Sequence, residues 1–348
     1  MKKFSCVLLT LILAALCCSC SIEAADQRFS KDFFDLFDTV STVTAYDTNE
    51  KAFDFHFDQF HKKLEEYHKL YDVYNSYDGI VNLNTLNAKA GEAPVEVDKR
   101  IIDLLEYGKE VYDLSSGKTN ICFGAVLSIW SDYRQSGIDH PETAALPTME
   151  ELEAAAEHTD INDLVIDREN STVYFADPEL QLDVGAIAKG YAVRETCAWA
   201  QENLWSSAII SIGGNICTIG CKGNDGETPW IIGIENPDQT AANYLDVIKI
   251  INMSAVTSGD YQRYYTVNGK RYCHIIDTQT LMPAEYVSGV TVICADSALG
   301  DALSTTLFNM PIEQGLELVE SVQGVEAVWA DKDYNKIYSS GFGAYINN

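Results

Sequence analysis

The sequence predicts an α+β fold in which mixed sheets pack against helices. Segments with strand composition and segments with helical periodicity interleave along the chain, without the strict strand–helix alternation of a parallel sheet. The chain has 348 residues, of which 47% are hydrophobic, and this is enough core material for one large or two ordinary domains. The sequence contains no internal repeat, low-complexity run or clear linker that would mark a domain boundary.

The first elements follow from local composition. The β-branched residues between Phe37 and Tyr46 predict a strand. Apolar residues at helical spacing predict an amphipathic helix from Phe53 to about Val73. A second helix is predicted from Lys99 to Leu114, because Ser115-Ser116-Gly117 would end it there.

A polar segment and a hairpin follow in the middle of the chain. We expect a surface loop around residues 133–143, which are mostly polar. Thr148 and Glu151 have the spacing of a capping box, so a third helix is predicted to begin at this point. Two short β-rich runs, residues 165–167 and 173–175, predict a hairpin.

The second half of the chain is predicted to be rich in strands. The predicted strands share short apolar or β-branched runs: 208–212, 230–234, 245–251, 264–267, 272–276, 290–293, 325–329 and 336–338. Two helices are predicted among them, over residues 297–308 and 315–321.

The charge balance limits the class of partner. The formal net charge is −28, so nucleic acid and anionic membrane surfaces are not expected partners, since both require Lys and Arg. A phosphate ligand would have to be held by backbone amides, a particular lysine or a bound cation. The excess of carboxylates is compatible with a divalent metal ion.

The N-terminus resembles an export signal. Lys2 and Lys3 precede an apolar stretch, residues 7–16, that is too short to span a bilayer. The Cys-Cys-Ser-Cys run that follows resembles a bacterial lipoprotein processing site, with Cys20 as the lipidated residue. We therefore expect a signal peptide over residues 1–20, a polar tether over 21–32, and a lipid-anchored protein on the extracytoplasmic face of the cell membrane. The alternative is a plain secreted protein.

The stretch from Leu182 to Val193 is the most informative motif. An apolar run with one carboxylate, Asp183, reaches a turn of small residues and passes Lys189 into a predicted helix. A helix N-terminus approached by small residues offers free N–H groups to a phosphate. An ordinary strand–turn–helix connection is the simpler alternative.

Four further stretches carry groups that can bind a ligand. Asp301 and Thr305 are four residues apart on a predicted helix, where both offer oxygen to Mg²⁺, although an exposed helix face would look the same. The other three stretches are Gly213-Gly214-Asn215, Thr257-Ser258-Gly259-Asp260, and His274-Ile275-Ile276-Asp277.

These five motifs, in this order, resemble the ApbE family of bacterial FAD:protein FMN transferases. The resemblance runs from about Phe37 to the C-terminus and implies a T-fold-like architecture for a transferase domain over residues 33–348. It also implies Mg²⁺ as cofactor, FAD as substrate and an exported protein as flavin acceptor.

The resemblance further implies site residues. The positions that correspond to FAD contacts are Phe37, Tyr74, Lys118, Thr119, Asn120, Asp183, Lys189, Thr257, His274 and Ile275. The positions that correspond to the metal site are Ala186, through its backbone carbonyl, together with Asp301, Ser304 and Thr305. The chain departs from the family where many members have Gly-Ala-Phe-Asp, because Gly117-Lys118-Thr119-Asn120 stands there.

The reaction that the resemblance implies is the transfer of FMN from FAD to a Ser or Thr hydroxyl, with release of AMP. The attacking hydroxyl needs a proton acceptor, and the candidates are His274 and then Asp301. Two alternatives stay open: an FAD pyrophosphatase in which water attacks, and an FAD-binding lipoprotein without turnover.

Overall fold

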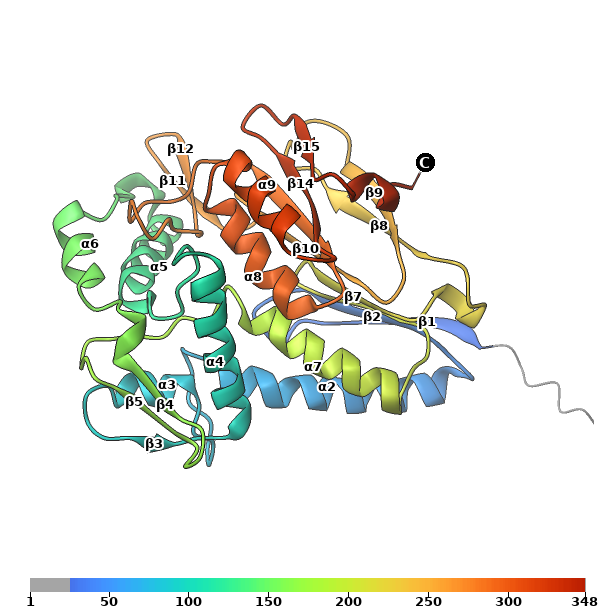
Figure 1. Cartoon of the computed structure of the whole chain (residues 1–348), viewed down its shortest axis with the longest axis horizontal. Helices are drawn as coiled ribbons and strands as arrows, with labels where there is room; N and C mark the ends of the chain where they lie inside the picture. Colours follow the sequence, from blue (N-terminus) through green and yellow to red (C-terminus); the bar gives the residue numbers. More distant parts are fainter. Residues whose placement is uncertain (1–25, 348) are drawn as a thin grey trace, which may run out of the picture.

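The computed structural model describes residues 26–347. Residues 1–25, which include the predicted lipidation site at Cys20, lie outside the described part of the chain, as does residue 348. The α+β class predicted from the sequence is confirmed, with helices and sheets arranged as in Figure 1.

An antiparallel sheet of eight strands forms the centre of the fold, with strand order β1-β2-β6-β7-β10-β13-β14-β15. Its strands are β1 (Gln27–Phe33), β2 (Ser41–Asp47), β6 (Ala208–Ile212), β7 (Asn215–Ile219), β10 (Ser254–Gly259), β13 (Gly289–Cys294), β14 (Glu326–Ala330) and β15 (Lys336–Tyr338).

The described residues form the following α-helices: α2 (Glu50–Tyr71), α3 (Leu83–Ala88), α4 (Lys99–Leu114), α5 (Gly124–Asp139), α6 (Met149–Ala156), α7 (Ala188–Asn203), α8 (Ser297–Phe308) and α9 (Ile312–Ser321). The capping box predicted at Thr148 is present, since its side chain accepts from the Glu151 amide at the start of α6. The boundaries predicted for α4 and α8 are confirmed.

Different elements pack against the two faces of the central sheet. Val292 and Trp329 point to the side of α8 and α9, while their neighbours Ile293 and Val328 point to the opposite side. There they meet the hairpin of β8 (Trp230–Glu235) and β9 (Tyr244–Ile250). Figure 1 shows the helices in front of the sheet and this hairpin behind it.

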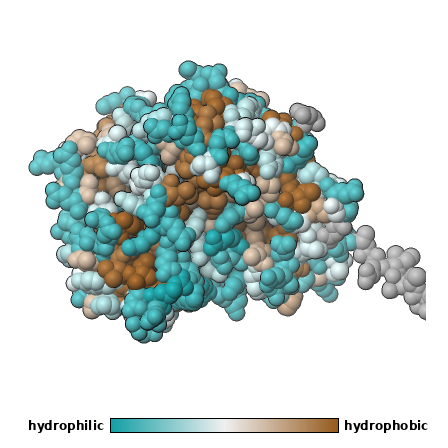
Figure 2. Space-filling view, in the orientation of Figure 1, coloured by the Kyte–Doolittle hydropathy of each residue, from teal (hydrophilic) through white to brown (hydrophobic). Residues whose placement is uncertain are grey.

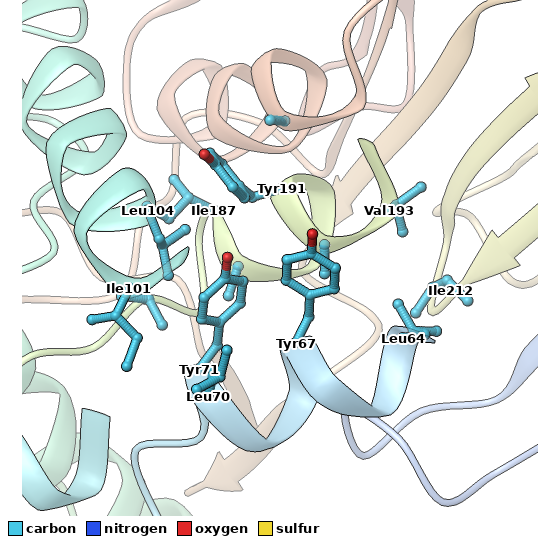
Figure 3. Close-up of a cluster of buried hydrophobic side chains, with 14 of the residues drawn as sticks. Leu64, Tyr67, Leu70, Tyr71, Ile101, Leu104, Ile187, Tyr191, Val193 and Ile212 are labelled. Atoms are coloured by element: carbon cyan, nitrogen blue, oxygen red, sulfur yellow. The ribbon is translucent and has the colours of Figure 1, made fainter. Parts of the chain in front are cut away.

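Aromatic side chains join the helices α2 and α7. Tyr67 and Tyr71 of α2 point towards α7 (Figure 3), where the Tyr191 ring packs edge-on against the Tyr71 ring, with the ring centroids 6.2 Å apart. Leu64 of α2 and Val193 of α7 lie in the same cluster (Figure 3). This packing fixes α7 on the sheet, and with it the motif that precedes α7.

Smaller sheets lie at one end of the molecule, beside α3 to α6 (Figure 1). They are formed by β3 (Val95–Glu96), β5 (Thr172–Phe175) and β4 (Leu164–Asp167), and by β11 (Tyr264–Val267) with β12 (Lys270–Cys273). The predicted hairpin of residues 165–167 and 173–175 is confirmed as β4 and β5.

Four local predictions are wrong. The strand predicted between Phe37 and Tyr46 begins only at Ser41, because Phe37 and Asp38 adopt a positive φ in the turn before β2. The tether predicted over residues 21–32 is wrong from Gln27 onwards, because β1 pairs with β2 along its whole length. The loop predicted around 133–143 is helical as far as Asp139, because α5 continues through this polar segment. The strand predicted over 272–276 ends at Cys273, after which Ile276 forms an isolated antiparallel bridge with Pro283.

The face of the molecule shown in Figure 2 is mostly hydrophilic. Hydrophilic side chains cover most of the face shown in Figure 2, with hydrophobic areas between them. None of the helices within residues 26–347 is long and apolar enough to cross a membrane.

Candidate active site

A cavity of about 840 Å³ lies where α7 begins. Its walls come from the segment before β2, from α5, from the start of α7, from the β6–β7 turn, from β10, from the chain after β12, and from α8. Since these segments are far apart in sequence, the cavity forms only when the central sheet and its helical layer are assembled.

Most of the predicted site residues line this cavity: Tyr74, Lys118, Thr119, Asn120, Asp183, Ala186, Lys189, Thr257, His274, Ile275, Asp301 and Thr305. Phe37 and Ser304 do not line it, although residues next to each of them do.

Phe37 is turned away by its backbone conformation. Its φ is +56°, and its ring packs against His68 of α2 with centroids 5.2 Å apart. Its N–H also donates to His68 Nδ1 over 3.3 Å. Phe34 and Asp38 line the cavity in its place.

Ser304 faces the central sheet instead of the cavity. It is fully buried, and its hydroxyl lies 2.9 Å from the Ser258 hydroxyl of β10 and 2.9 Å from the Asp301 carbonyl, to which it donates. Asp301 and Thr305 share the other side of α8, because a spacing of four residues keeps them on one face.

The N-terminus of α7 and the helix α8 meet at one pair of residues. The Gly190 N–H donates to Asp301 Oδ2 over 2.7 Å. An ideal helix would direct this N–H to the Ala186 carbonyl, four residues earlier. The contact therefore leaves the Ala186 carbonyl available at the cavity wall.

Burial raises the pKa of Asp183 and Asp301, two of the acidic residues that line the cavity. Desolvation raises the pKa of Asp301 above its ordinary value of 3.8, and the Lys189 charge and the Gly190 N–H oppose it. Desolvation also raises the pKa of Asp183, whose Oδ1 accepts from the Gly185 N–H over 2.8 Å. A cation bound beside either carboxylate would favour its ionised form.

His274 is held in one tautomer. Its ring Nδ1 lies 3.1 Å from the Arg263 carbonyl, and its backbone N–H donates to the same oxygen over 3.0 Å. Because a carbonyl only accepts, Nδ1 carries the proton and Nε2 keeps its lone pair. Burial, followed by the positive charge of Arg263, lowers the pKa of His274 to about 3, so the imidazole is neutral at pH 7.

The loop before α5 is fixed from two sides. Lys118 is buried, and its Nζ donates to Asp277 over 3.3 Å and to Gln279 over 2.9 Å. The Thr119 hydroxyl lies 2.7 Å from the Thr306 hydroxyl of α8. The Asn120 side chain donates to the Thr159 carbonyl over 2.9 Å.

Two arginines that line the cavity were not among the site residues predicted from the sequence. Arg134 and Arg263 both line it, and neither has a carboxylate within 4.0 Å among residues 26–347. Desolvation lowers the pKa of Arg134, which donates to the Ser131 hydroxyl. Arg134 lies four residues after Trp130, another cavity residue, so the two share one face of α5. This spacing could have identified Arg134 only if the helix α5 had been predicted.

The oxygen atoms of this wall suit a hard divalent cation. Asp301 supplies a carboxylate, Thr305 a hydroxyl and Ala186 a carbonyl, all on the cavity wall. Mg²⁺ binds proteins through few oxygen ligands and takes others from water and substrate phosphates. The residues present therefore fit Mg²⁺. Among the described residues, no cluster of three or more His, Cys, Asp and Glu side chains forms a self-contained metal centre.

Known proteins resemble this chain over most of its length. A model of the ApbE family matches residues 37–329. A FAD:protein FMN transferase of Treponema pallidum is 33% identical over 271 residues, which is 74% of this chain and 73% of the relative. One from Klebsiella pneumoniae is 27% identical over 280 residues, covering 78% and 84%. The crystal structure of an ApbE protein from Thermotoga maritima aligns with a TM-score of 0.80 and 25% identity, over 92% of this chain and 100% of that one.

Proposed function

This chain belongs to the ApbE family, and from this premise we propose that it is a FAD:protein FMN transferase. In the proposed reaction, a Ser or Thr hydroxyl of another protein attacks the phosphorus of the FMN half of FAD. A new phosphoester bond forms, the bond from that phosphorus to the bridging oxygen breaks, and AMP leaves.

The observation that carries this proposal is the Gly190–Asp301 contact. It brings the N-terminus of α7, where the positive end of the helix dipole and the Lys189 side chain favour a diphosphate, against the carboxylate of α8. A diphosphate at this wall would be held by groups that favour negative charge, while the acidic remainder of the protein repels it.

Mg²⁺ would be held by Asp301, Thr305 and the Ala186 carbonyl. When bound, it would neutralise charge on the phosphate oxygens. Ser304 was predicted to join this set, but its buried hydroxyl bonds elsewhere, so we leave it out of the proposed ligands.

His274 would take the proton of the attacking hydroxyl at Nε2. Its tautomer is set by the Arg263 carbonyl, and its neutral state leaves the lone pair free at pH 7. A diphosphate bound nearby would offset the Arg263 charge and raise the pKa of His274 towards the range in which a general base is effective.

Exposed apolar side chains at the cavity support a macromolecular acceptor. Phe34, Val40 and Tyr74 line the cavity and are 67%, 61% and 67% exposed. Such side chains around an opening are suited to contact with another protein.

We also propose that the protein is exported and anchored through Cys20, so that the acceptor is an exported protein. Membrane association that is lost in a Cys20→Ser variant would support the anchor. Unchanged fractionation of this variant would contradict it.

The function is tested by incubating the purified protein with FAD, Mg²⁺ and an exported candidate acceptor, and by following AMP release and flavin fluorescence on a denaturing gel. A transferase gives AMP and a fluorescent acceptor band only when all components are present. AMP with free FMN and no acceptor indicates a pyrophosphatase, and FAD binding without either product indicates a carrier.

A further inference from the structure

The segment before β2 reaches the cavity in a strained backbone conformation. We call residues 34–40 the rim segment, because several of them line the cavity: Phe34, Asp38, Thr39 and Val40. Within it, Phe37 and Asp38 have φ values of +56° and +49°, a left-handed conformation that residues other than glycine rarely adopt. Such a conformation persists only where neighbouring groups hold it in place.

His68 of α2 holds the rim segment at the first of these two residues. The Phe37 N–H donates to His68 Nδ1 over 3.3 Å, and the two rings pack edge-on. Beyond this point, Arg263 donates to the Asp38 carbonyl over 3.1 Å, and the Val40 carbonyl accepts from the β6–β7 turn over 3.2 Å. The bond to His68 therefore ties the strained turn to α2.

The other nitrogen of the imidazole fixes the tautomer that this bond needs. The Tyr77 hydroxyl donates to Asp72 Oδ2 over 2.7 Å and lies 3.3 Å from His68 Nε2. Burial raises the pKa of Asp72, but hydrogen bonds from Tyr77 and Asn75 outweigh burial and hold this pKa below 3.8. Asp72 is thus a carboxylate that only accepts, so the Tyr77 oxygen accepts from Nε2–H. The lone pair is left on Nδ1, where the Phe37 N–H uses it.

Protonation of His68 would remove this acceptor. A charged imidazole carries a proton on both nitrogens, so Nδ1 would turn a second donor towards the Phe37 N–H. The Nε2–H bond to Tyr77 is compatible with both charge states, so only the side that faces the rim segment changes. Histidine ordinarily changes charge between about pH 5 and 8.

Other charged or titratable groups lie around the His68–Tyr77 pair on each element that packs there. They come from the rim segment, the loop after α2, α2 itself and the chain before β11: Asp35, Asp38, Asp72, Tyr77, Glu65, Lys69 and Arg263. Their charges influence the pH at which the imidazole titrates. They do not change the outcome, because Nδ1 of a charged ring cannot accept a hydrogen bond.

We infer that His68 is a positioning residue of the cavity, and that its protonation releases the rim segment from α2. Neutral His68 keeps Phe37 and Asp38 in the left-handed conformation that places the rim segment on the cavity wall. When the ring becomes charged, the Phe37 N–H loses its acceptor, the strained turn relaxes, and FAD binds more weakly. The effect on FAD rests on the proposed function, whereas the release of the rim segment does not.

Deuterium exchange of the 34–40 amides, without FAD and at pH 8 and 5.5, tests the release. In His68→Asn, the side-chain oxygen can replace Nδ1 as acceptor and cannot be protonated at either pH. Wild type and His68→Asn should exchange alike at pH 8, whereas the wild type should exchange about 5-fold faster at pH 5.5, the usual effect of one hydrogen bond. His68→Leu has no acceptor and should exchange faster than His68→Asn at both pH values. Intrinsic exchange rates cancel, because these substitutions leave the rim segment itself unchanged.

Fluorescence titration of FAD with the same proteins tests the consequence for the site. The affinity of the wild type relative to His68→Asn should fall between pH 8 and 5.5 by the same factor as the exchange rates. Because all other titrating groups are shared, His274 included, this ratio isolates His68. His140→Asn is the matched control and should follow the wild type at both pH values, since His140 is an exposed histidine at the end of α5.

The wild type decides alone if the variants fail to fold. Protection factors, from which the intrinsic effect of pH has been divided out, should fall more for residues 34–40 than for β10 between pH 8 and 5.5. An equal fall in both segments would overturn the inference.

Two results with the variants would also overturn it. One is equal exchange of wild type and His68→Asn at pH 5.5. The other is faster exchange in the wild type while its FAD affinity matches that of His68→Asn at both pH values, since the rim segment would then not serve the site. Release of the rim segment in a protein that transfers no FMN would refute the proposed function and leave this role of His68 standing.

Discussion

The Gly190 N–H donates to the Asp301 carboxylate over 2.7 Å, and this contact joins the first turn of α7 to α8. It depends on the absence of a side chain, because a Cβ at Gly190 would lie 2.3 Å from the Asp301 Cβ and 2.5 Å from the Ser297 carbonyl. Glycine thus allows two helices to approach closely enough for the cavity wall to form.

Gly190→Ala should force α7 and α8 apart. We expect a loss of about 1–3 kcal/mol in the free energy of unfolding, typical of overpacked positions. FAD affinity should fall as well, since the contact between Gly190 and Asp301 positions α7 and α8 in the cavity wall. Gly343→Ala is the control, because its Cβ would meet no atom within 4 Å. Urea denaturation of both variants checks this, and equal stability would refute the close-packing argument.

Asp301→Asn should lower the transfer rate without lowering the stability of the fold. Because its pKa is raised in the folded state, the folded protein binds this proton more tightly than the unfolded chain, and ionisation above pH 3.8 costs stability. The variant should therefore melt at or above the wild-type temperature at pH 7 without Mg²⁺. Its transfer rate should fall about 100-fold or more, because bound Mg²⁺ contributes several kcal/mol to charge stabilisation and the variant would lose one of its ligands.

Mg²⁺ titrations monitored by thermal melting provide the direct check of this metal site. Mg²⁺ should raise the melting temperature of the wild type and of the exposed control Asp58→Asn, but not that of Asp301→Asn. Mg²⁺ stabilisation that persists in Asp301→Asn would remove Asp301 from the proposed ligands.

His274→Gln should change the pH dependence of stability. The pKa of His274 falls from 6.5 to about 3 on folding, so the unfolded chain binds its proton more tightly, and wild-type stability is lost as pH falls from about 6.5 towards 3. The variant should lose less stability over this window, as shown by unfolding free energies at pH 8, 6 and 5. Parallel wild-type and variant curves would contradict the lowered pKa.

The same variant tests the role of His274 as base. At saturating FAD, the transfer rate of His274→Gln should fall about 100-fold, within the usual range for loss of a general base, while FAD affinity stays within about twofold. His140→Gln, an exposed histidine at the end of α5, serves as the control. A wild-type rate in His274→Gln would exclude it as the base.

Lys189→Met should weaken FAD binding more than it slows transfer. Lys189 lies at the N-terminus of α7, where its charge adds to that of the helix end, so its loss should lower FAD affinity about 10-fold. Riboflavin, which has no phosphate, should bind as before. Fluorescence titration compares both ligands, with Lys62→Met as an exposed control; equal losses for both ligands would count against a phosphate contact.

Much of the site was predictable because its groups lie in short local motifs. The turn before α7 and the i, i+4 pair Asp301 and Thr305 need only local geometry to be recognised, and both reach the cavity. Ser304 has the same local signal but faces β10, because its orientation depends on the packing of α8 against the sheet. Phe37 does not line the cavity for a similar reason. Its positive φ results from the turn into β2 and its contact with His68.

The remaining errors come from long-range pairing. The segment predicted to be a tether has little hydrophobic patterning, and it becomes β1 because β2 offers an open edge for pairing. Arg134 was missed because α5 is polar over its last turns, and burial of Val126 and Trp130 determines that it is a helix. Neither interaction can be read from the segment alone.

The central claim is that FMN moves from FAD to a protein hydroxyl, and the most direct measurement is the ratio of acceptor-bound FMN to AMP over a time course. Intact mass spectrometry gives the former, and chromatography of the same samples gives AMP. The proposed function predicts a ratio near one, with bound FMN lost when the acceptor's modified Ser or Thr is replaced by Ala. AMP that accumulates with free FMN while the acceptor mass stays unchanged would contradict it.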